Sequence, residues 1–371
     1  MPDMLQQTLC GWGKHLVPAE FGHRIAVDEI EFSVRNSPKW ALGMPQAYDL
    51  RERGLSPAGE IALGMAMINK TMEDLIDRGL TVDQVAPSLA WVSTSDIDFF
   101  EEIAKFRALR RYWARTMKER FGSQDLRAQR LRIACHTSGK SLVYKQPLNN
   151  LTRTAIQGLA ALCGGVQSLD ACTFDEPVCV PTHEARELAT RQQQILANEV
   201  GAARVADPFG GSYYIEALTD KVEAEAIAML ARIEQVGLIE AIASGKIEEM
   251  MDDFNFDLQR ELDNGERIIV GVNQFVPEDE PSPTRFKFDR TNTYAHIRRF
   301  AELKQQRDQA NWSASLKNVY NVVRDGNNPM QAMIDAFIAD ASIGEIWGTV
   351  RVANGHPFDP YGHLQAPLSY T

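Results

Sequence analysis

The stretch from Arg132 to Thr182 constrains the fold more than any other, because strand-like and helix-like segments alternate along it. The apolar run Leu131–Cys135 is typical of a buried strand, and small or polar residues follow it. The pair Asn149-Asn150 suits the N-cap of a helix over Leu151–Cys163, and a second strand begins in Val166–Leu169. Two strands joined by a helix predict a parallel βαβ unit.

Ligands of parallel α/β proteins bind where the carboxyl ends of the strands meet. The loops after Cys135 and Leu169 are therefore the candidate site. Further apolar runs predict strands at Trp40–Met44, Ser88–Val92 and Ile268–Val272. This gives an α/β fold with about five parallel strands, where a closed (β/α)8 barrel needs eight. An open doubly wound sheet is the alternative, but no G-x-G-x-x-G follows any of these runs.

Helical periodicity fills the intervals between the strands. Ser56 caps a predicted helix to about Asp77, and the strongest periodic segment is Phe99–Phe121. We predict an N-terminal segment over residues 1–35, a partial (β/α) barrel over 36–276, and a linker with a mostly helical C-terminal region over 277–371. The outer face of the periodic segment is interpreted as solvated or subunit-facing, and its basic residues are Lys105, Arg107, Arg110, Arg111, Arg115, Lys118 and Arg120.

Composition excludes several classes of partner. The formal net charge of -11 argues against a nucleic-acid backbone as ligand. The sequence has no run of about 18 apolar residues, so no membrane span is expected. The 5 cysteines form no C-x-x-C pair, which favours reduced thiols in a cytoplasmic protein.

No common catalytic motif is present, since the 7 histidines are scattered and there is no H-E-x-x-H, P-loop or G-x-S-x-G. Polar residues at the strand ends remain: Tyr48, Asp49, Ser93, Asp96, His136, Lys140, Asp170, Asp175 and Glu176. His136 directly follows a buried strand and is suited to act as an acid or a hydrogen-bond donor, with a purely structural histidine as the alternative. Cys172 and Cys179 have no nearby base in the sequence and are interpreted as inert thiols.

Several collinear motifs carry a resemblance to a known family. R-x-x-C-H-T-S-G-x-S-L, Q-P-x-N-N-x-x-R-T-A-I, G-G-x-Q-S-L and F-D-E-P resemble the large chain of the methylmalonyl-CoA mutase family. The segments Asp98–Gly122, Ala206–Thr219 and Ile268–Phe275 resemble the same family. The resemblance covers nearly all of residues 36–350 and, more loosely, residues 5–35.

The resemblance implies a fold, a cofactor and partners. The family's substrate domain is a (β/α)8 barrel, and a separate C-terminal domain binds adenosylcobalamin. The chain resembles the later barrel strands and the following linker, and the family's D-x-H-x-x-G cobalamin motif is absent. The resemblance therefore implies a radical isomerisation of an acyl-CoA substrate, with other chains supplying the remaining strands and a cobalamin-binding subunit. The edge of a partial barrel also implies a homo- or hetero-oligomer.

The resemblance places the catalytic positions on three residues that differ from the family pattern. The family's Tyr-His pair corresponds to Tyr48-Asp49, so a carboxylate replaces the imidazole that contacts the thioester carbonyl. A family glutamine corresponds to His136. The arginine that pairs with a substrate carboxylate falls near Trp12, which removes a bidentate clamp.

Cofactor and substrate positions follow from the same comparison. Glu176 and Cys179 correspond to cobalamin-contacting positions, and Lys140 replaces a tryptophan beside the site. The Arg and Ser that meet CoA correspond to Ser88 and Ala90.

Three interpretations stay open from the sequence. The first is a catalytic component of an adenosylcobalamin-dependent acyl-CoA mutase. The second is a non-catalytic partner or scaffold subunit of such a mutase. The third is a mutase for an altered substrate, a non-CoA one included, which uses Asp49, His136 and Lys140 as a new polar set.

Overall fold

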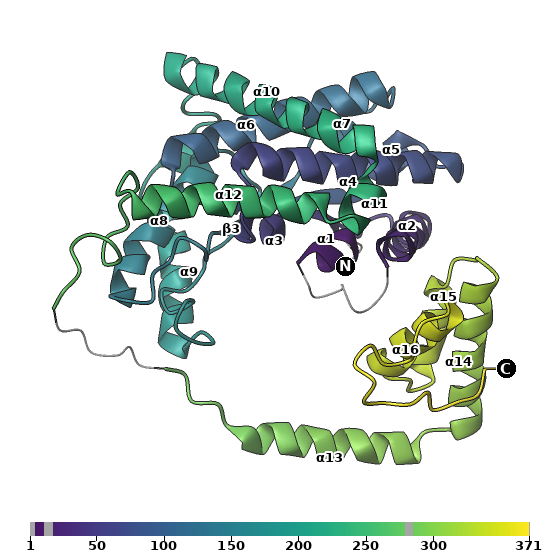
Figure 1. Cartoon of the computed structure of the whole chain (residues 1–371). Coiled ribbons are helices and arrows are strands. Elements are labelled where there is room, and N and C mark those ends of the chain that lie inside the picture. The colour runs from purple at the N-terminus through teal and green to yellow at the C-terminus, as the bar shows by residue number, and fades with distance from the viewer. Residues whose placement is uncertain (1–3, 11–17, 279–284, 371) are drawn as a thin grey trace. The chain divides into compact units, whose positions relative to one another are not determined.

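The computed structural model describes residues 4–10, 18–278 and 285–370 (Figure 1). The chain divides into two compact units. The first comprises residues 41–286, and the second combines residues 2–40 with residues 287–371. No helix in the described ranges is both long enough and apolar enough to cross a bilayer.

The first unit is built on a four-stranded parallel sheet in the order β1-β2-β3-β4. The strands are β1 Leu42–Gln46, β2 Leu89–Ser95, β3 Ile133–Thr137 and β4 Ser168–Asp170. Each connection contains at least one helix, as parallel pairing requires. The predicted class is confirmed: this is an α/β unit consistent with a partial (β/α) barrel, and a helical region follows it.

The fifth predicted strand is wrong. Residues 268–272 form no strand, and Val270 makes only an isolated bridge to Gln274 across a turn. The backbone N–H of Gly271 donates to the carbonyl of Gln274 at 2.8 Å, which closes the segment on itself. The β-branched run therefore has no neighbouring strand to pair with.

The helices of the first unit connect the strands, and several of them contact the sheet directly. They are α3 Ala47–Glu52, α4 Pro57–Asp77, α5 Val82–Val85, α6 Phe99–Arg115, α7 Leu126–Gln129, α8 Asn150–Cys163, α9 His183–Asn198, α10 Tyr213–Val236, α11 Leu238–Ala243 and α12 Lys246–Asp263. Ser56 accepts a hydrogen bond from Gly59 N at 3.0 Å, so the predicted cap of α4 is confirmed. In Figure 1, α10 runs beside α4 and α6.

The two faces of the sheet differ in what covers them. On the helix-facing side, Trp91 lies so close to Gly64 of α4 that a Cβ there would come within 2.3 Å of the indole. The Ser95 hydroxyl on the same side donates to the Gln157 carbonyl of α8 at 2.7 Å. Because side chains alternate along a strand, the residues between them face the other way.

That second face, here called the open face, carries small or polar residues in register. They are Gly43 with Ala90, Val92 with Ala134 and Ser168, and Thr94 with His136 and Asp170. On this face Val92 and Thr94 of β2 are buried, and the exposed fraction rises from β2 to β4, where Ser168 and Asp170 are exposed. In a closed barrel this face would be the interior, so its exposure fits a sheet that stops short of closure.

Part of the basic face of α6 forms ion pairs within the chain. Arg107 pairs with Glu216 at 2.7 Å, and Arg111 pairs with Asp220 at 2.7 Å, both acids on α10. Lys105 is fully buried. The predicted solvated or subunit-facing surface is therefore wrong for Lys105, whereas Arg111, Arg115, Lys118 and Arg120 of the same face are exposed.

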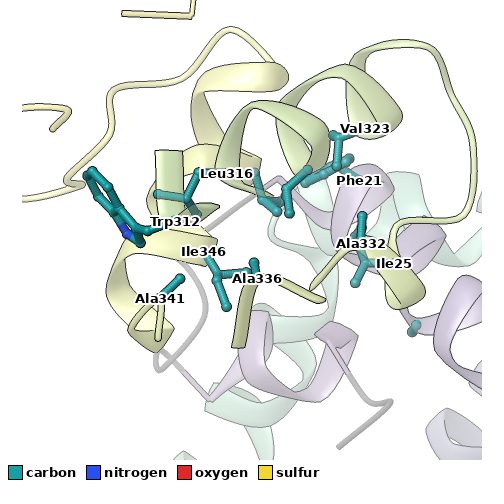
Figure 2. Packing of buried hydrophobic residues seen from close by; sticks show 12 residues of the cluster. Phe21, Ile25, Trp312, Leu316, Val323, Ala332, Ala336, Ala341 and Ile346 are labelled. Atoms are coloured by element: carbon teal, nitrogen blue, oxygen red, sulfur yellow. The ribbon is translucent and has the colours of Figure 1, made fainter. Parts of the chain in front are cut away.

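The second unit is helical. Its elements are α1 Met4–Leu9, α2 Ala19–Asn36, α13 Arg290–Gln306, α14 Gln309–Arg324, α15 Met330–Ile338 and α16 Ile343–Ala353. Figure 2 shows Phe21 and Ile25 of α2 in one cluster with Leu316 and Ile346, all buried. The N-terminal helix α2 thus completes the core of the C-terminal region.

Glu345 gives this unit a testable pH dependence. Burial alone would raise the pKa of Glu345, but hydrogen bonds from Arg307, Ser342 and Lys304 lower that pKa to about 2. A carboxyl group whose pKa is lower in the folded state stabilises the fold at pH values above its unfolded pKa of about 4.3. This contribution is lost as the pH falls toward 2. We expect Glu345→Gln to lower the free energy of unfolding by about 2 kcal/mol at pH 7, because glutamine keeps the cap but not the charge.

Urea unfolding of wild type and Glu345→Gln between pH 7 and pH 2 measures this effect. The difference should shrink as the pH falls below about 4.5. Glu302→Gln, on the exposed helix α13, is the matched control and should change little. Parallel curves for wild type and Glu345→Gln across the whole range would contradict the assignment.

Candidate active site

The predicted catalytic residues gather at the carboxyl ends of the strands. Tyr48 and Asp49 lie in α3, which begins directly after β1. His136 lies near the end of β3, and its ring centroid is 4.6 Å from that of Tyr48 with the planes tilted by 38°. The nitrogen Nδ1 of His136 lies 3.3 Å from Oδ2 of Asp170. The structure therefore brings Tyr48, Asp49 and His136 together and adds Asp170.

The charges around His136 are carboxylates. Burial raises the pKa of Asp49, and the nearby His136 opposes that rise. The hydrogen bond from His136 lowers the pKa of Asp170. Asp170 is thus an ionised acceptor at neutral pH, while Asp49 takes up a proton more readily than an exposed aspartate.

A second group of acids surrounds the Tyr48 hydroxyl. Burial raises the pKa of Tyr48 above its ordinary value, and the neighbouring Cys172, Glu52 and Glu176 raise it further. Burial and Glu176 raise the pKa of Cys172 to about 12. The phenol and the thiol therefore keep their protons at neutral pH, which agrees with the interpretation of Cys172 as a non-nucleophilic thiol.

The predicted cofactor residues lie on the loops after β3 and β4. The Lys140 backbone donates to Glu52 at 2.8 Å, while its ammonium group donates to Asn255 of α12 at 2.8 Å. Glu176 accepts from the Thr173 hydroxyl at 3.4 Å, and burial raises the pKa of Glu176. Lys140 is therefore directed at α12 in this structure.

Cys179 lies further along the loop after β4. Its sulfur accepts a hydrogen bond from the backbone N–H of Phe286 at 3.2 Å. Phe286 belongs to the segment that follows α12, so this contact ties the end of the first unit to the loop after β4.

The predicted substrate residues lie toward the other end of β2. Ser88 directly precedes β2, is buried, and donates its hydroxyl hydrogen to the Val85 carbonyl at 2.7 Å. Ala90 lies on the open face opposite Gly43. Trp12 lies outside the described residues.

A cavity of about 900 Å³ adjoins this site. Its walls come from the start of α4, the segment after β2, the loop after β3, the start of α8, helix α12 and residues 267–270. Arg51 and Asp96 form part of the wall and lie 3.6 Å apart. Within the described ranges, no group of His, Cys, Asp and Glu is arranged to hold a metal ion.

Sequence reasoning left residues 246–263 unassigned and so missed α12 as a wall of the cavity. Apolar residues at helical spacing, Ile247, Met251, Phe254 and Leu258, give the signal that identifies this helix. No sequence pattern marks Arg51 as a residue of the cavity wall, because its carboxylate partners come from α6 and from the end of β2.

The fold defines an α/β protein of the partial barrel type, with the candidate site residues at the carboxyl ends of the strands. Its sequence matches the model of the family described as methylmalonyl-CoA mutase over residues 2–356. The chain belongs to the methylmalonyl-CoA mutase family.

Named relatives place the chain within that family. It is 36% identical over 348 residues to the 2-hydroxyisobutanoyl-CoA mutase large subunit of Aquincola tertiaricarbonis, covering 91% of the chain and 62% of that protein. It is 32% identical over 344 residues to methylmalonyl-CoA mutase of Rhizobium meliloti, covering 92% and 48%. The mitochondrial methylmalonyl-CoA mutase of Homo sapiens is also 32% identical over 344 residues, with 92% and 46% covered. The chain thus spans between about half and three fifths of these relatives.

Proposed function

We propose that the chain is a component of an adenosylcobalamin-dependent acyl-CoA mutase. In this proposal, separate chains supply the rest of the barrel and the cobalamin-binding domain. Family membership over nearly the whole chain supports a mutase, and one relative is named a large subunit. The observation that carries the proposal is the meeting of Tyr48, Asp49 and His136 at the carboxyl ends of the strands, beside the open face.

The residues beside the open face suit a bound corrin. A Cβ on Gly139 would lie 3.4 Å from Glu52 Oε2 and 3.7 Å from Glu176 Cγ, so the backbone there forms a narrow cradle between two carboxyl groups. Burial raises the pKa of both carboxyls, so each takes up a proton more readily than an exposed glutamate, and a protonated carboxyl donates a hydrogen bond to an amide oxygen at a cofactor's rim. Glu176, with Cys179 and Lys140 on the same loops, would hold adenosylcobalamin, whose cobalt–carbon bond supplies the initiating radical by homolysis.

The chain's own residues would bind and orient the acyl group. Tyr48 keeps its proton and offers a hydroxyl donor, and its ring supports the His136 imidazole. Completion of the barrel would enclose these groups and exclude water from the radical. Asp49 and His136 differ from the family pattern, which supports an acyl group unlike methylmalonyl.

A scaffold subunit is the second candidate, favoured by a specific observation. The Ser88 hydroxyl is buried and bonded to Val85, and Ala90 has no polar group, so neither position offers the contact that the family makes with CoA. A subunit that keeps the fold but has lost CoA binding would show this arrangement.

Reconstitution separates the two candidates. The purified chain is mixed with a candidate cobalamin-binding subunit, adenosylcobalamin and a panel of CoA esters, and cob(II)alamin is followed by absorbance and electron paramagnetic resonance. An ester-dependent signal that requires the chain supports the catalytic component. A stable complex by mass measurement that stays silent with every ester supports the scaffold, and the absence of any complex overturns both.

A further inference from the structure

We propose that Asp170 is a positioning residue that fixes the tautomer of His136 and thereby selects acyl groups bearing a hydrogen-bond donor, such as a hydroxyl. The tautomer follows from the geometry alone. The ligand's identity rests on the proposed function, because it assumes that the open face binds an acyl group.

The imidazole of His136 is held from two sides. His136 and Asp170 are paired neighbours in the ladder between β3 and β4, so their side chains point to the same face. On the other side, the Tyr48 ring lies against the imidazole. Tyr48 is itself anchored, because its backbone carbonyl accepts a hydrogen bond from Thr94 at 3.3 Å.

The contact with Asp170 determines which nitrogen carries the proton. An ionised carboxylate only accepts hydrogen bonds, so the 3.3 Å contact between Nδ1 and Oδ2 of Asp170 favours an imidazole protonated at Nδ1. The hydrogen bond made by one ring nitrogen sets the state of the other. Nε2 has no hydrogen-bond partner within the described part of the chain, and it is free to meet a ligand on the open face.

In its neutral form, an imidazole held in this way offers a lone pair at Nε2. The lone pair accepts a hydrogen bond from a hydroxyl but repels a carbonyl oxygen. This acceptor favours a hydroxyacyl group over a plain acyl group or one with a free carboxylate.

Nitrogen-15 NMR of the histidine-labelled full chain tests the tautomer without any cofactor. We expect neutral His136 to show the Nδ1–H form in wild type and to lose it in Asp170→Ala. Asp170→Asn should retain it, because the amide oxygen still accepts. The Asp170 side chain is 71% exposed, so these variants should fold, and Asp77→Ala at the exposed end of α4 is the matched control.

An Nε2–H form in wild type, or no change in Asp170→Ala, would overturn the positioning role. The specificity is tested in the reconstituted complex with paired CoA esters that differ by one hydroxyl. Asp170→Ala should raise KM for the hydroxyacyl ester about tenfold and leave KM for its partner unchanged. An equal change for both esters overturns the specificity, whereas wild-type inactivity with every ester counts against the proposed function and leaves the NMR result standing.

Discussion

Replacing Lys105 with methionine is expected to lower the free energy of unfolding by about 3–5 kcal/mol, because it removes the ammonium group that two buried carboxylates share. The ammonium group is fully buried, 2.8 Å from Glu60 Oε2 and 2.5 Å from Glu102 Oε2. It also donates to the Thr94 carbonyl of β2. Burial lowers the pKa of Lys105, but the two carboxylates outweigh it, so the lysine is charged in the fold.

The same charges reach the wall of the cavity. Glu102 also pairs with Arg51 at 3.4 Å, and Arg51 pairs with Asp96 at 3.6 Å. The loss of Lys105 therefore removes one of two cations that compensate three carboxylates. We expect the loss of local stability to extend from α6 to the start of α4, which lines the cavity.

Urea unfolding followed by circular dichroism measures the effect of Lys105→Met. Lys118→Met is the matched control, because Lys118 is exposed in the π-helical turn Thr116–Arg120 and should change stability by less than about 0.5 kcal/mol. Adding Glu60→Gln and Glu102→Gln to Lys105→Met should recover part of the loss, since no buried charge then lacks a partner. Equal effects of the two single lysine variants would contradict the buried network.

The strands were largely predictable, since burial on the helix-facing side leaves an apolar signature. The predicted Leu131–Cys135 overlaps β3 Ile133–Thr137, and the predicted Ser88–Val92 overlaps β2 Leu89–Ser95. Helix α4 was predictable at both ends, because its cap and its periodicity are local properties of the sequence. Capping and periodicity were enough to predict an element wherever the local preference of the sequence agrees with the tertiary packing.

The errors have a common physical origin in partners that are distant in sequence. The run Ile268–Val272 has strand propensity, but a strand needs a neighbour, and none pairs with it. Lys105 looked like a surface charge because Glu60 lies 45 residues away. Propensity and periodicity carry no information about such partners.

The candidate site was predictable in position but not in its contacts. The rule that ligands bind at the carboxyl ends of parallel strands places Tyr48, Asp49 and His136 near one another, and the structure brings them together. The contact between His136 and Asp170 depends on the register of β3 and β4, which the sequence does not specify. The direction of Lys140 toward α12 likewise required the structure.

Asn150 shows how a residue with a local prediction takes a long-range role, and its replacement by leucine is expected to cost about 3 kcal/mol or more. Its side chain makes no cap: the N-cap of α8 is Asn149, which makes no side-chain cap bond either. Instead, the fully buried amide of Asn150 accepts from Val143 N at 3.0 Å and donates to the carbonyls of Val143 and Phe174 at 2.9 Å. One side chain thus joins the loop after β3 to the loop after β4.

Leucine in place of Asn150 would leave one backbone N–H and two carbonyls without partners in a dry site, and each unsatisfied group costs about 1–3 kcal/mol. Asn150→Asp keeps the shape but turns an oxygen toward two carbonyls, so it should destabilise nearly as much. Asn149→Leu, at an exposed neighbour, is the matched control and should cost less than about 1 kcal/mol. Urea unfolding measures these costs, and hydrogen exchange should show lost protection at the amide of Val143. If Asn150→Asp is as stable as wild type, the amide does not hold the two loops together.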